Sequence, residues 1–332
     1  MNYKSLNVIV PAYNEDSSID EFLQKISSVQ LVRNHMMLNY DWHTEITFID
    51  DGSTDKTKNT ILKAIQNVDR FTNLTISYIE LSRNFGKEGA MWAGLTSISK
   101  ETDAIAIADI DLQDPVEQIY EYADDVISKK FDAVVAFRET RPNESKLRKA
   151  LTHKFYQMMN LLSDVPIREN VRDFRVMNQD VLQAILKVTE KNRFSKGIFA
   201  WVGYNVDYRG YQSQPRMHGN SKFSMLKLID YATDGIVGFS KKPLHIIYLA
   251  SMLLFGFSII GIIAILFQKF TGHHAIDGWT SIVTILLFLS SIQIGIIGVI
   301  GEYIGQIFTE TKARPVVISK PKITGTSNVS KN

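Results

Sequence analysis

The sequence predicts an α/β domain built on a parallel, helix-covered sheet, followed by two membrane-spanning helices. In the first part of the chain, short apolar runs alternate with segments of helical spacing, which is typical of parallel sheets. Two later stretches, Leu244–Phe267 and Trp279–Ile300, contain no charged residue. Each exceeds the roughly 20 residues that a helix needs to cross a bilayer. The alternative is a pair of buried core helices, although core helices of that length usually show a polar stripe.

Five short apolar or β-rich runs are predicted to be strands. They are Leu6–Val10, Glu45–Ile49, Thr75–Leu81, Ala104–Ala108 and Asp132–Phe137. Helical spacing in Ile19–Val29 and Thr57–Val68 supplies covering helices. Polar clusters follow the first, second and fourth strands. Because ligands of such sheets bind at the carboxyl ends of the strands, these clusters predict one site.

The chain is predicted to divide into four parts. Residues 1–222 form the main domain, with an amphipathic helix at about 146–162, and residues 223–242 form a second amphipathic helix. Both helices either lie on a membrane surface or pack on the sheet. Residues 243–306 hold the two spans, at about 244–267 and 279–301, and 307–332 form a tail. After Pro321 the tail is rich in Ser, Thr, Lys and Asn, which predicts disorder.

Basic residues flank the two spans on one side. Lys241 and Lys242 precede the first span, while Lys312, Arg314, Lys320 and Lys322 follow the second, and the connection offers only Lys269. This bias predicts that the main domain and both termini are cytoplasmic. Nothing at the N-terminus resembles a signal peptide, and the absence of cysteine agrees with a reducing compartment.

Asp109 and Asp111 lie two residues apart at the end of the fourth strand. Their carboxylates therefore project to the same side, where they can bind one hard cation such as Mg²⁺ or Mn²⁺. Gln113 continues the spacing. Asp114 has a different interpretation, because Asp-Pro-Val-Glu reads as a helix capping box, so we predict a structural role for it.

Asp50 and Asp51 precede Gly52 in a tight turn after the second strand. A carboxylate there can accept hydrogen bonds from a base or ribose, or the segment is simply a turn and helix cap. We expect both, with Asp51 on the ligand. The chain has no Gly-x-Gly-x-x-Gly after the first strand and no Walker A sequence. Any bound nucleotide is thus expected to be held by carboxylates and a metal, and no nucleic acid partner is expected.

Five motifs together carry a family resemblance. They are Val-Ile-Val-Pro-Ala-Tyr-Asn-Glu (8–15), Asp-Asp-Gly-Ser-Thr-Asp (50–55), Leu-Ser-Arg-Asn-Phe-Gly-Lys-Glu-Gly-Ala (81–90), Ala-Asp-Ile-Asp-Leu-Gln-Asp-Pro (108–115) and Val-Arg-Asp-Phe-Arg-Val-Met (171–177). In this order they resemble the family 2 glycosyltransferases, in particular those that glycosylate polyprenyl phosphates, such as bactoprenol glucosyltransferases and dolichyl-phosphate mannose synthases. The resemblance implies a GT-A (Rossmann-like) fold, a nucleotide-sugar donor, a divalent metal and a polyprenyl-phosphate acceptor in the bacterial inner membrane.

The resemblance also implies roles for individual residues. It implies that the nucleotide sugar is bound by Pro11, Tyr13, Glu15, Asp51, Arg216 and Lys222, the last two in a flexible loop that closes on the donor. It implies that the metal is bound by Asp109, Asp111 and Gln113, and the lipid phosphate by Arg138, Arg148 and Thr152. Asp173 falls at the catalytic position. Ile110 departs from the alanine that is commoner there, but its side chain is expected to point away from the metal.

The implied reaction is an inverting attack of a lipid phosphate on the anomeric carbon. A phosphate monoester has a second pKa of about 6, so it needs little help from a base. We therefore expect Asp173 to position a neighbouring cation, Arg172 or Arg175, or the phosphate itself. The alternative, which the resemblance implies, is that Asp173 acts as a general base. The expected donor is UDP-glucose, with UDP-N-acetylglucosamine, galactose or mannose donors as alternatives.

Two other kinds of protein are weighed against this interpretation. A processive polysaccharide synthase usually carries Gln-x-x-Arg-Trp and more spans, and none of the four tryptophans has that context. A non-catalytic membrane scaffold for a flippase or a second transferase has no need of intact Asp109, Asp111 and Asp173. Glycines in the spans allow close packing of helices or protomers, so a homo-oligomer stays open.

Overall fold

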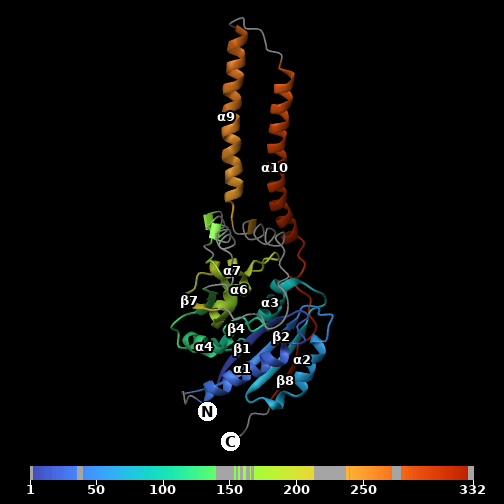
Figure 1. Ribbon diagram of the computed structural model, residues 1–332, viewed down its shortest axis with the longest axis vertical. Coiled ribbons are helices and arrows are strands. Elements are labelled where there is room, and N and C mark those ends of the chain that lie inside the picture. Colours follow the sequence, from blue (N-terminus) through green and yellow to red (C-terminus); the bar gives the residue numbers. More distant parts are fainter. Residues whose placement is uncertain are drawn as a thin grey trace. The chain divides into compact units, whose positions relative to one another are not determined.

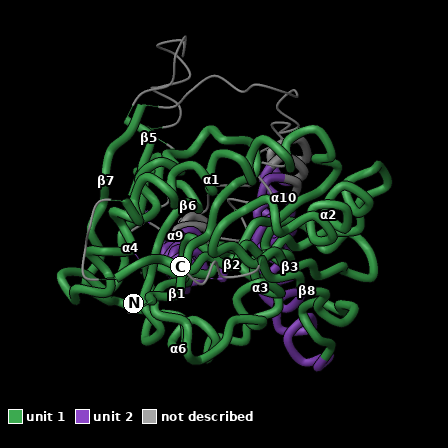
Figure 2. The backbone as a smooth tube through the Cα atoms, turned by 90° about the horizontal axis from the view of Figure 1, so that it is seen from below, with its two compact units in different colours: residues 1–157, 166–224, 314–332 green, residues 158–165, 225–313 purple. Residues whose placement is uncertain are grey.

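A computed structural model describes residues 3–35, 40–139, 153–154, 156–157, 160–161, 165, 168–212, 237–238, 240–270 and 278–327 (Figure 1). The chain forms two compact units (Figure 2). The first comprises Met1–Gln157, Pro166–Ser224 and Arg314–Asn332, and the second comprises Met158–Val165 and Met225–Ala313.

The first unit is organised around one eight-stranded sheet with the order β7-β5-β6-β4-β1-β2-β3-β8. Its strands are β1 (Tyr3–Ala12), β2 (Asp41–Asp50), β3 (Leu74–Glu80), β4 (Ala104–Ile107), β5 (Ala133–Arg138), β6 (Val171–Met177), β7 (Val206–Tyr211) and β8 (Ile323–Thr326). All five strands predicted from the sequence are present, whereas β6, β7 and β8 were not anticipated.

The sheet is mixed rather than purely parallel, which corrects the prediction. β4, β1, β2 and β3 are parallel neighbours, but β6 lies between β4 and β5 and is antiparallel to both. The pairing of Ile107 with Arg175 puts the residues just before Arg175 beyond the end of β4. The start of β6 therefore meets the carboxyl end of β4, at the edge where the predicted site lies.

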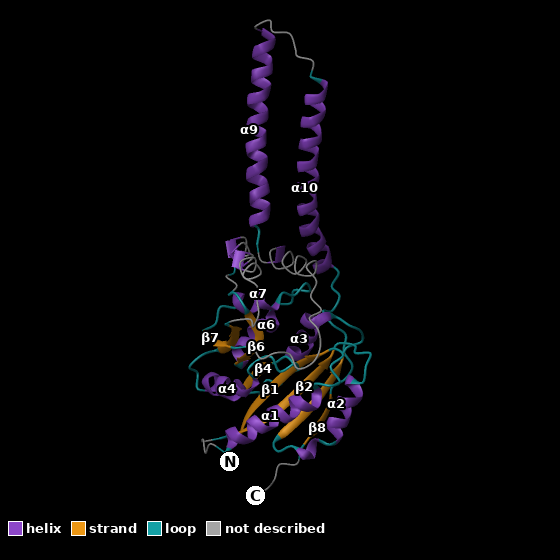
Figure 3. Cartoon of the chain, in the orientation of Figure 1, coloured by secondary structure: helices purple, strands orange, loops and turns teal. Residues whose placement is uncertain are grey.

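Helices cover both faces of the sheet (Figure 3). α1 (Ile19–Asn34), α2 (Thr57–Gln66) and α4 (Ile119–Ile127) pack on one face, and α3 (Gly86–Thr96) and α6 (Gln179–Lys187) pack on the other. A Cβ at Gly94 of α3 would lie 2.3 Å from the Ile9 side chain of β1, so glycine permits this close approach. The shorter elements are η1 (Val68–Arg70), η2 (Val116–Gln118) and α7 (Ser195–Trp201).

The predicted disorder after Pro321 is wrong for the described part of the tail. β8 pairs antiparallel with β3, and Ser327 exchanges hydrogen bonds with the backbone of Leu74. Lys320 and Lys322 contact Glu80 and Glu45, at 2.6 Å in each case. The composition of the tail predicted disorder because the tail has few apolar residues to bury. The exposed edge of the sheet at β3 instead supplies backbone hydrogen-bond partners, which composition does not reveal.

The second unit contains two long apolar helices, α9 (Lys242–Phe270) and α10 (Trp279–Thr311). Both begin near the predicted positions and continue past them. Each is long and apolar enough to cross a membrane. The most apolar stretch of each helix is not buried by other parts of the described chain. A buried core pair would be covered by other elements, so the burial favours membrane spans over core helices. Most of the predicted amphipathic helices at 146–162 and 223–242 lies outside the described residues.

Candidate active site

The loops after β1 and β2 are joined by hydrogen bonds. The Asp51 amide donates to the Ala12 carbonyl at 2.9 Å, and the Glu15 amide donates to Thr57 Oγ1 at 2.9 Å. Asn14, in the left-handed region with φ 56°, donates to Ser53 Oγ at 3.0 Å. Pro11, Tyr13, Glu15 and Asp51, the predicted nucleoside ligands, therefore belong to one edge. Tyr13 is exposed there, while Asp51 is buried.

The two carboxylates of the second loop bind protein groups. Asp50 accepts hydrogen bonds from the Ser53 amide at 2.8 Å and the Tyr78 hydroxyl at 2.7 Å. Asp51 accepts from the Phe85 amide at 2.6 Å and the Gly86 amide at 2.9 Å. Desolvation raises the pKa of Asp51 above its ordinary value, although these amides oppose the shift. Asp51 thus anchors the loop after β3, and its contact with a nucleoside stays a prediction.

Gly52 allows that loop to come close. Its φ is 70°, and a Cβ on it would lie 2.8 Å from backbone atoms of Arg83 and Asn84. Any other residue would therefore push the loop away from Asp51.

Lys87, in the first turn of α3, lies between two predicted functional carboxylates. Its ammonium nitrogen is 2.6 Å from Asp109 Oδ1, 3.0 Å from Asp109 Oδ2 and 2.6 Å from Asp173 Oδ2. Desolvation lowers the pKa of Lys87, but the two carboxylates outweigh it and raise that pKa above its ordinary value. Lys87 is therefore a permanent cation at this edge.

Arg172 binds Asp109 from another direction. Its Nη2 is 3.3 Å from Asp109 Oδ2 and its Nε is 3.0 Å from Asp114 Oδ1. The Tyr211 hydroxyl also donates to Asp114, at 2.6 Å. Asp114 is structural, as predicted, but the capping-box reason was wrong, because η2 has Pro115 at its N-cap and no side-chain cap. The buried carboxylate instead holds Arg172 beside Asp109.

Asp173 lies near the start of β6. Because β6 runs antiparallel to β4, this end of β6 lies at the carboxyl end of β4. Desolvation raises its pKa, but Lys87 and then Lys196 lower it more, so the pKa of Asp173 lies below its ordinary value. The ion pair of the Asp173 side chain is with Lys87, which the sequence did not single out. Arg175 donates to the backbone carbonyls of Asp173 and Arg172, at 3.1 Å in each case.

The predicted metal ligands lie in the turn after β4. Asp111 Oδ1 accepts from the Gln113 amide at 3.2 Å, and Gln113 Oε1 lies 3.4 Å from Nη2 of Arg138. These oxygen donors fit Mg²⁺ or Mn²⁺ in kind, and Asp109 already attracts two cationic side chains. Among the described residues no cluster of three His, Cys, Asp or Glu side chains could hold a metal alone. A metal here would take its remaining oxygen ligands from water or from a substrate.

Three further charged residues were not singled out from the sequence. Lys87 and Glu88 lie within the motif at 81–90, where their place at the start of a helix after the third strand was the available signal. Lys196 in α7 had no such signal. Glu88 accepts hydrogen bonds from the Ser195 amide and hydroxyl, so it fixes α7 to α3. The desolvated Glu88 carboxyl has its pKa raised to about 7.

Lys196 is the cation of this group without a partner among the described residues. It forms no hydrogen bond or ion pair there, although Asp173 is close enough to act on its charge. Desolvation lowers the pKa of Lys196 below its ordinary value. Arg148, Thr152, Arg216 and Lys222, the remaining predicted ligands, lie outside the described residues.

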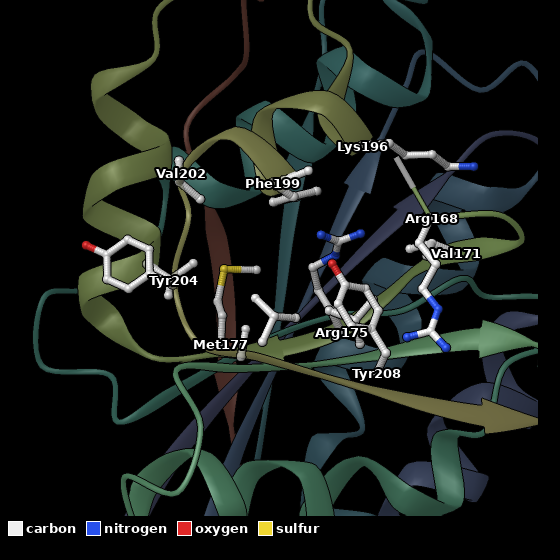
Figure 4. A pocket seen from close by; sticks show the side chains of 14 residues that line it. Arg168, Val171, Arg175, Met177, Lys196, Phe199, Val202, Tyr204 and Tyr208 are labelled. Atoms are coloured by element: carbon white, nitrogen blue, oxygen red, sulfur yellow. The ribbon is translucent and has the colours of Figure 1, made fainter. Parts of the chain in front are cut away.

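A small cavity lies between α7 and strands β5, β6 and β7 (Figure 4). Arg168 and Lys196 lie toward one end of the view, and Val202 and Tyr204 lie toward the other. Its free volume is about 30 Å³, close to that of one water molecule. The cavity is therefore a packing gap rather than a pocket for a sugar or lipid.

Comparison with known proteins identifies the family. The family model described as "Glycosyl transferase family 2" matches residues 7–186, and the one described as "GtrB C-terminal hairpin" matches residues 242–307. The chain belongs to glycosyltransferase family 2. It is a glycosyltransferase with a GT-A-like fold and a C-terminal helical hairpin.

Two relatives match almost their whole length. A "Prophage bactoprenol glucosyl transferase homolog" of Escherichia coli K12 is 34% identical over 315 residues, covering 95% of this chain and 98% of the relative. A "Bactoprenol glucosyl transferase" of Shigella phage SfV has the same identity and coverage. A solved mannosyltransferase from Pyrobaculum calidifontis overlaps with a TM-score of 0.47 at 16% identity, covering 90% of this chain and 86% of that one.

Proposed function

We propose that this glycosyltransferase transfers glucose from UDP-glucose to a polyprenyl phosphate, undecaprenyl phosphate in bacteria, with inversion at the anomeric carbon. Family membership and the names of the two bactoprenol glucosyl transferase relatives support the donor sugar and the acceptor. The observation that carries the proposal is the set of alternating charges formed by Lys87, Asp109, Arg172 and Asp173 at the carboxyl edge of the sheet. Such a set suits two substrates that each bring phosphate.

The donor is proposed to lie across the loops after β1 and β2. Pro11, Tyr13 and Glu15 would contact the nucleoside, with Asp51 beside them. Arg216 and Lys222 would close over the diphosphate, whereas Asp109, Asp111 and Gln113 would hold Mg²⁺ or Mn²⁺. When bound, that metal supplies positive charge to the leaving diphosphate.

In the proposed reaction a phosphate oxygen of the acceptor forms a bond to the anomeric carbon. The bond from that carbon to the diphosphate oxygen breaks, and UDP leaves with the electron pair. No proton must be removed from a dianionic phosphate. The lowered pKa of Asp173 makes it a weak base, which supports a role in holding Lys87 over that of proton acceptor.

The acceptor phosphate needs cations near Asp173. Arg138 contacts Gln113, and one of its nitrogens, Nε, is buried without a hydrogen bond. Lys196 is a second candidate, because it has no partner among the described residues. We assign the acceptor phosphate to these two residues, together with Arg148 and Thr152. A guanidinium and an ammonium both bind phosphate oxygens well.

Both termini are proposed to be cytoplasmic. β8 follows α10 and pairs with β3, so the tail and the main domain lie on the same side of any membrane. An even number of spans between them meets this requirement, as α9 and α10 do. The basic residues on both flanks of the hairpin favour the cytoplasmic side.

A direct assay tests the proposed function. Purified full-length protein in detergent is incubated with undecaprenyl phosphate and a panel of UDP- and GDP-sugars, and the lipid products are weighed by mass spectrometry. We expect one glycosyl-monophosphate lipid, formed most rapidly from UDP-glucose. A faster reaction with another nucleotide sugar would reassign the donor. No lipid product from any donor, with an active relative as control, would favour the scaffold.

A further inference from the structure

We infer that Lys87 competes with the divalent cation for Asp109, so that metal binds well only together with the donor diphosphate. The inference rests on the proposed function and deepens it, because it concerns the order in which metal and donor bind. It is carried by the position of one ammonium group between two carboxylates.

The contacts of Asp109 leave little negative charge free for a metal. Lys87 lies within 3.0 Å of both carboxylate oxygens, and Arg172 lies 3.3 Å from one of them. A divalent cation arriving alone would face two positive charges near its main ligand. Charge repulsion at this partly exposed site therefore weakens the binding of a cation that arrives without anionic ligands of its own.

A nucleoside diphosphate changes this balance. It brings negative charge and oxygen ligands of its own, which attract both the metal and the Lys87 ammonium. Lys87 has a flexible stem and a side chain 42% exposed, so its head can turn from Asp109 toward a phosphate. Asp109 then becomes available to the metal.

The backbone around Lys87 can stay in place during this exchange. Asp51 holds the amides of Phe85 and Gly86, directly before Lys87. Glu88, directly after it, holds Ser195 of α7. A side-chain movement between fixed neighbours is therefore sufficient, and its effect is a coupling between metal and donor that must be reciprocal.

The test measures Mn²⁺ affinity directly, by the electron paramagnetic resonance signal of free Mn²⁺, with and without UDP. Wild type is expected to bind Mn²⁺ weakly alone and about 100-fold more tightly with UDP. Lys87→Met is expected to bind Mn²⁺ alone about tenfold more tightly than wild type, since one positive charge is gone. Lys87→Gln, which keeps a polar side chain, should do the same if the Met variant folds poorly.

Lys58→Met provides a matched control. Lys58 also pairs with a carboxylate, Glu80 at 2.7 Å, and its side chain is 44% exposed. Its removal should leave Mn²⁺ affinity unchanged. Unchanged or weaker Mn²⁺ binding by both Lys87 variants without UDP would overturn the inference while leaving the metal proposal intact. Absence of Mn²⁺ binding by wild type even with UDP would overturn both.

Discussion

The two halves of the candidate site are held together by different forces. At the ends of β1 and β2, loops are joined mainly through backbone amides, as when Asp51 accepts from Phe85 and Gly86. At the ends of β4 and β6, side chains are joined by ion pairs, as when Lys87 bridges Asp109 and Asp173. Amide contacts fix a shape, whereas ion pairs between long side chains exchange partners when new charge arrives.

This difference suggests a division of labour. The half at the ends of β1 and β2, the proposed donor half, is preformed, so its variants should change donor affinity. The half at the ends of β4 and β6, the charged half, is proposed to bind phosphate groups of both substrates. Its variants should therefore change turnover and acceptor use. Ion pairs are also weakened by salt, unlike hydrogen bonds between amides and a buried carboxylate. Each experiment below tests whether the two halves separate in this way.

The largest effect is expected for Asp173→Asn. Loss of its charge breaks the ion pair with Lys87 and removes the negative charge that acts on Lys196, so transfer should fall by about 100-fold or more. The loss should be similar at pH 7 and pH 9, because the acceptor is then largely ionised and no base is required. Initial rates at saturating UDP-glucose check this. A defect that shrinks steeply as pH rises would assign Asp173 the role of base.

Replacement of Lys196 should have the next largest effect. Lys196→Met should raise the acceptor KM, or lower kcat, by about tenfold, and Lys196→Arg should recover most of the loss. UDP affinity should stay near that of wild type in both. The control is Lys187→Met, which replaces an exposed lysine at the end of α6. Weaker UDP binding in Lys196→Met would move this cation to the donor half.

The donor half was the more predictable from sequence. Strands β1 to β4 each contain a short apolar or β-rich run, and loops that follow parallel strands must share an edge. The location of Asp51 and Asp109 at that edge follows from this alone. What Asp51 binds did not follow, because the Phe85 and Gly86 amides come from a loop 34 residues further along the chain.

The charged half was harder to predict because it depends on strand order. The motif at 171–177 revealed Asp173 through family resemblance, but the insertion of β6 between β4 and β5 decides that Lys87 is its partner. Lys196 comes from a short helix fixed by Glu88, a contact across 107 residues. β8 escaped prediction for a related reason, since its partner edge is remote in sequence.

Asp51→Ala tests the donor half. It leaves two amides without their acceptor, at a cost of about 1–3 kcal/mol, and loosens the loop after β3. UDP affinity measured by calorimetry should fall by about tenfold, while the acceptor KM changes little. Asp20→Ala, which breaks an exposed pair with Arg70, should leave both unchanged. An acceptor defect as large as the donor defect would mean that the halves are not separable.

The smallest effect concerns Glu88, which joins the two halves through α3 and α7. Its pKa is raised from 4.5 to about 7 in the folded protein, mainly by desolvation. Between these values the folded state binds more protons than the unfolded state, so stability falls as pH rises and levels off above about pH 7.

Glu88→Gln should remove this slope, because the amide never ionises. The Tm of wild type relative to the variant should therefore drop by about 2–6 °C between pH 5 and pH 8. Ser128→Ala, at a surface position outside this contact, should keep the wild-type slope. Parallel pH dependence of the wild type and Glu88→Gln would mean that Glu88 is ionised in the folded protein throughout this range.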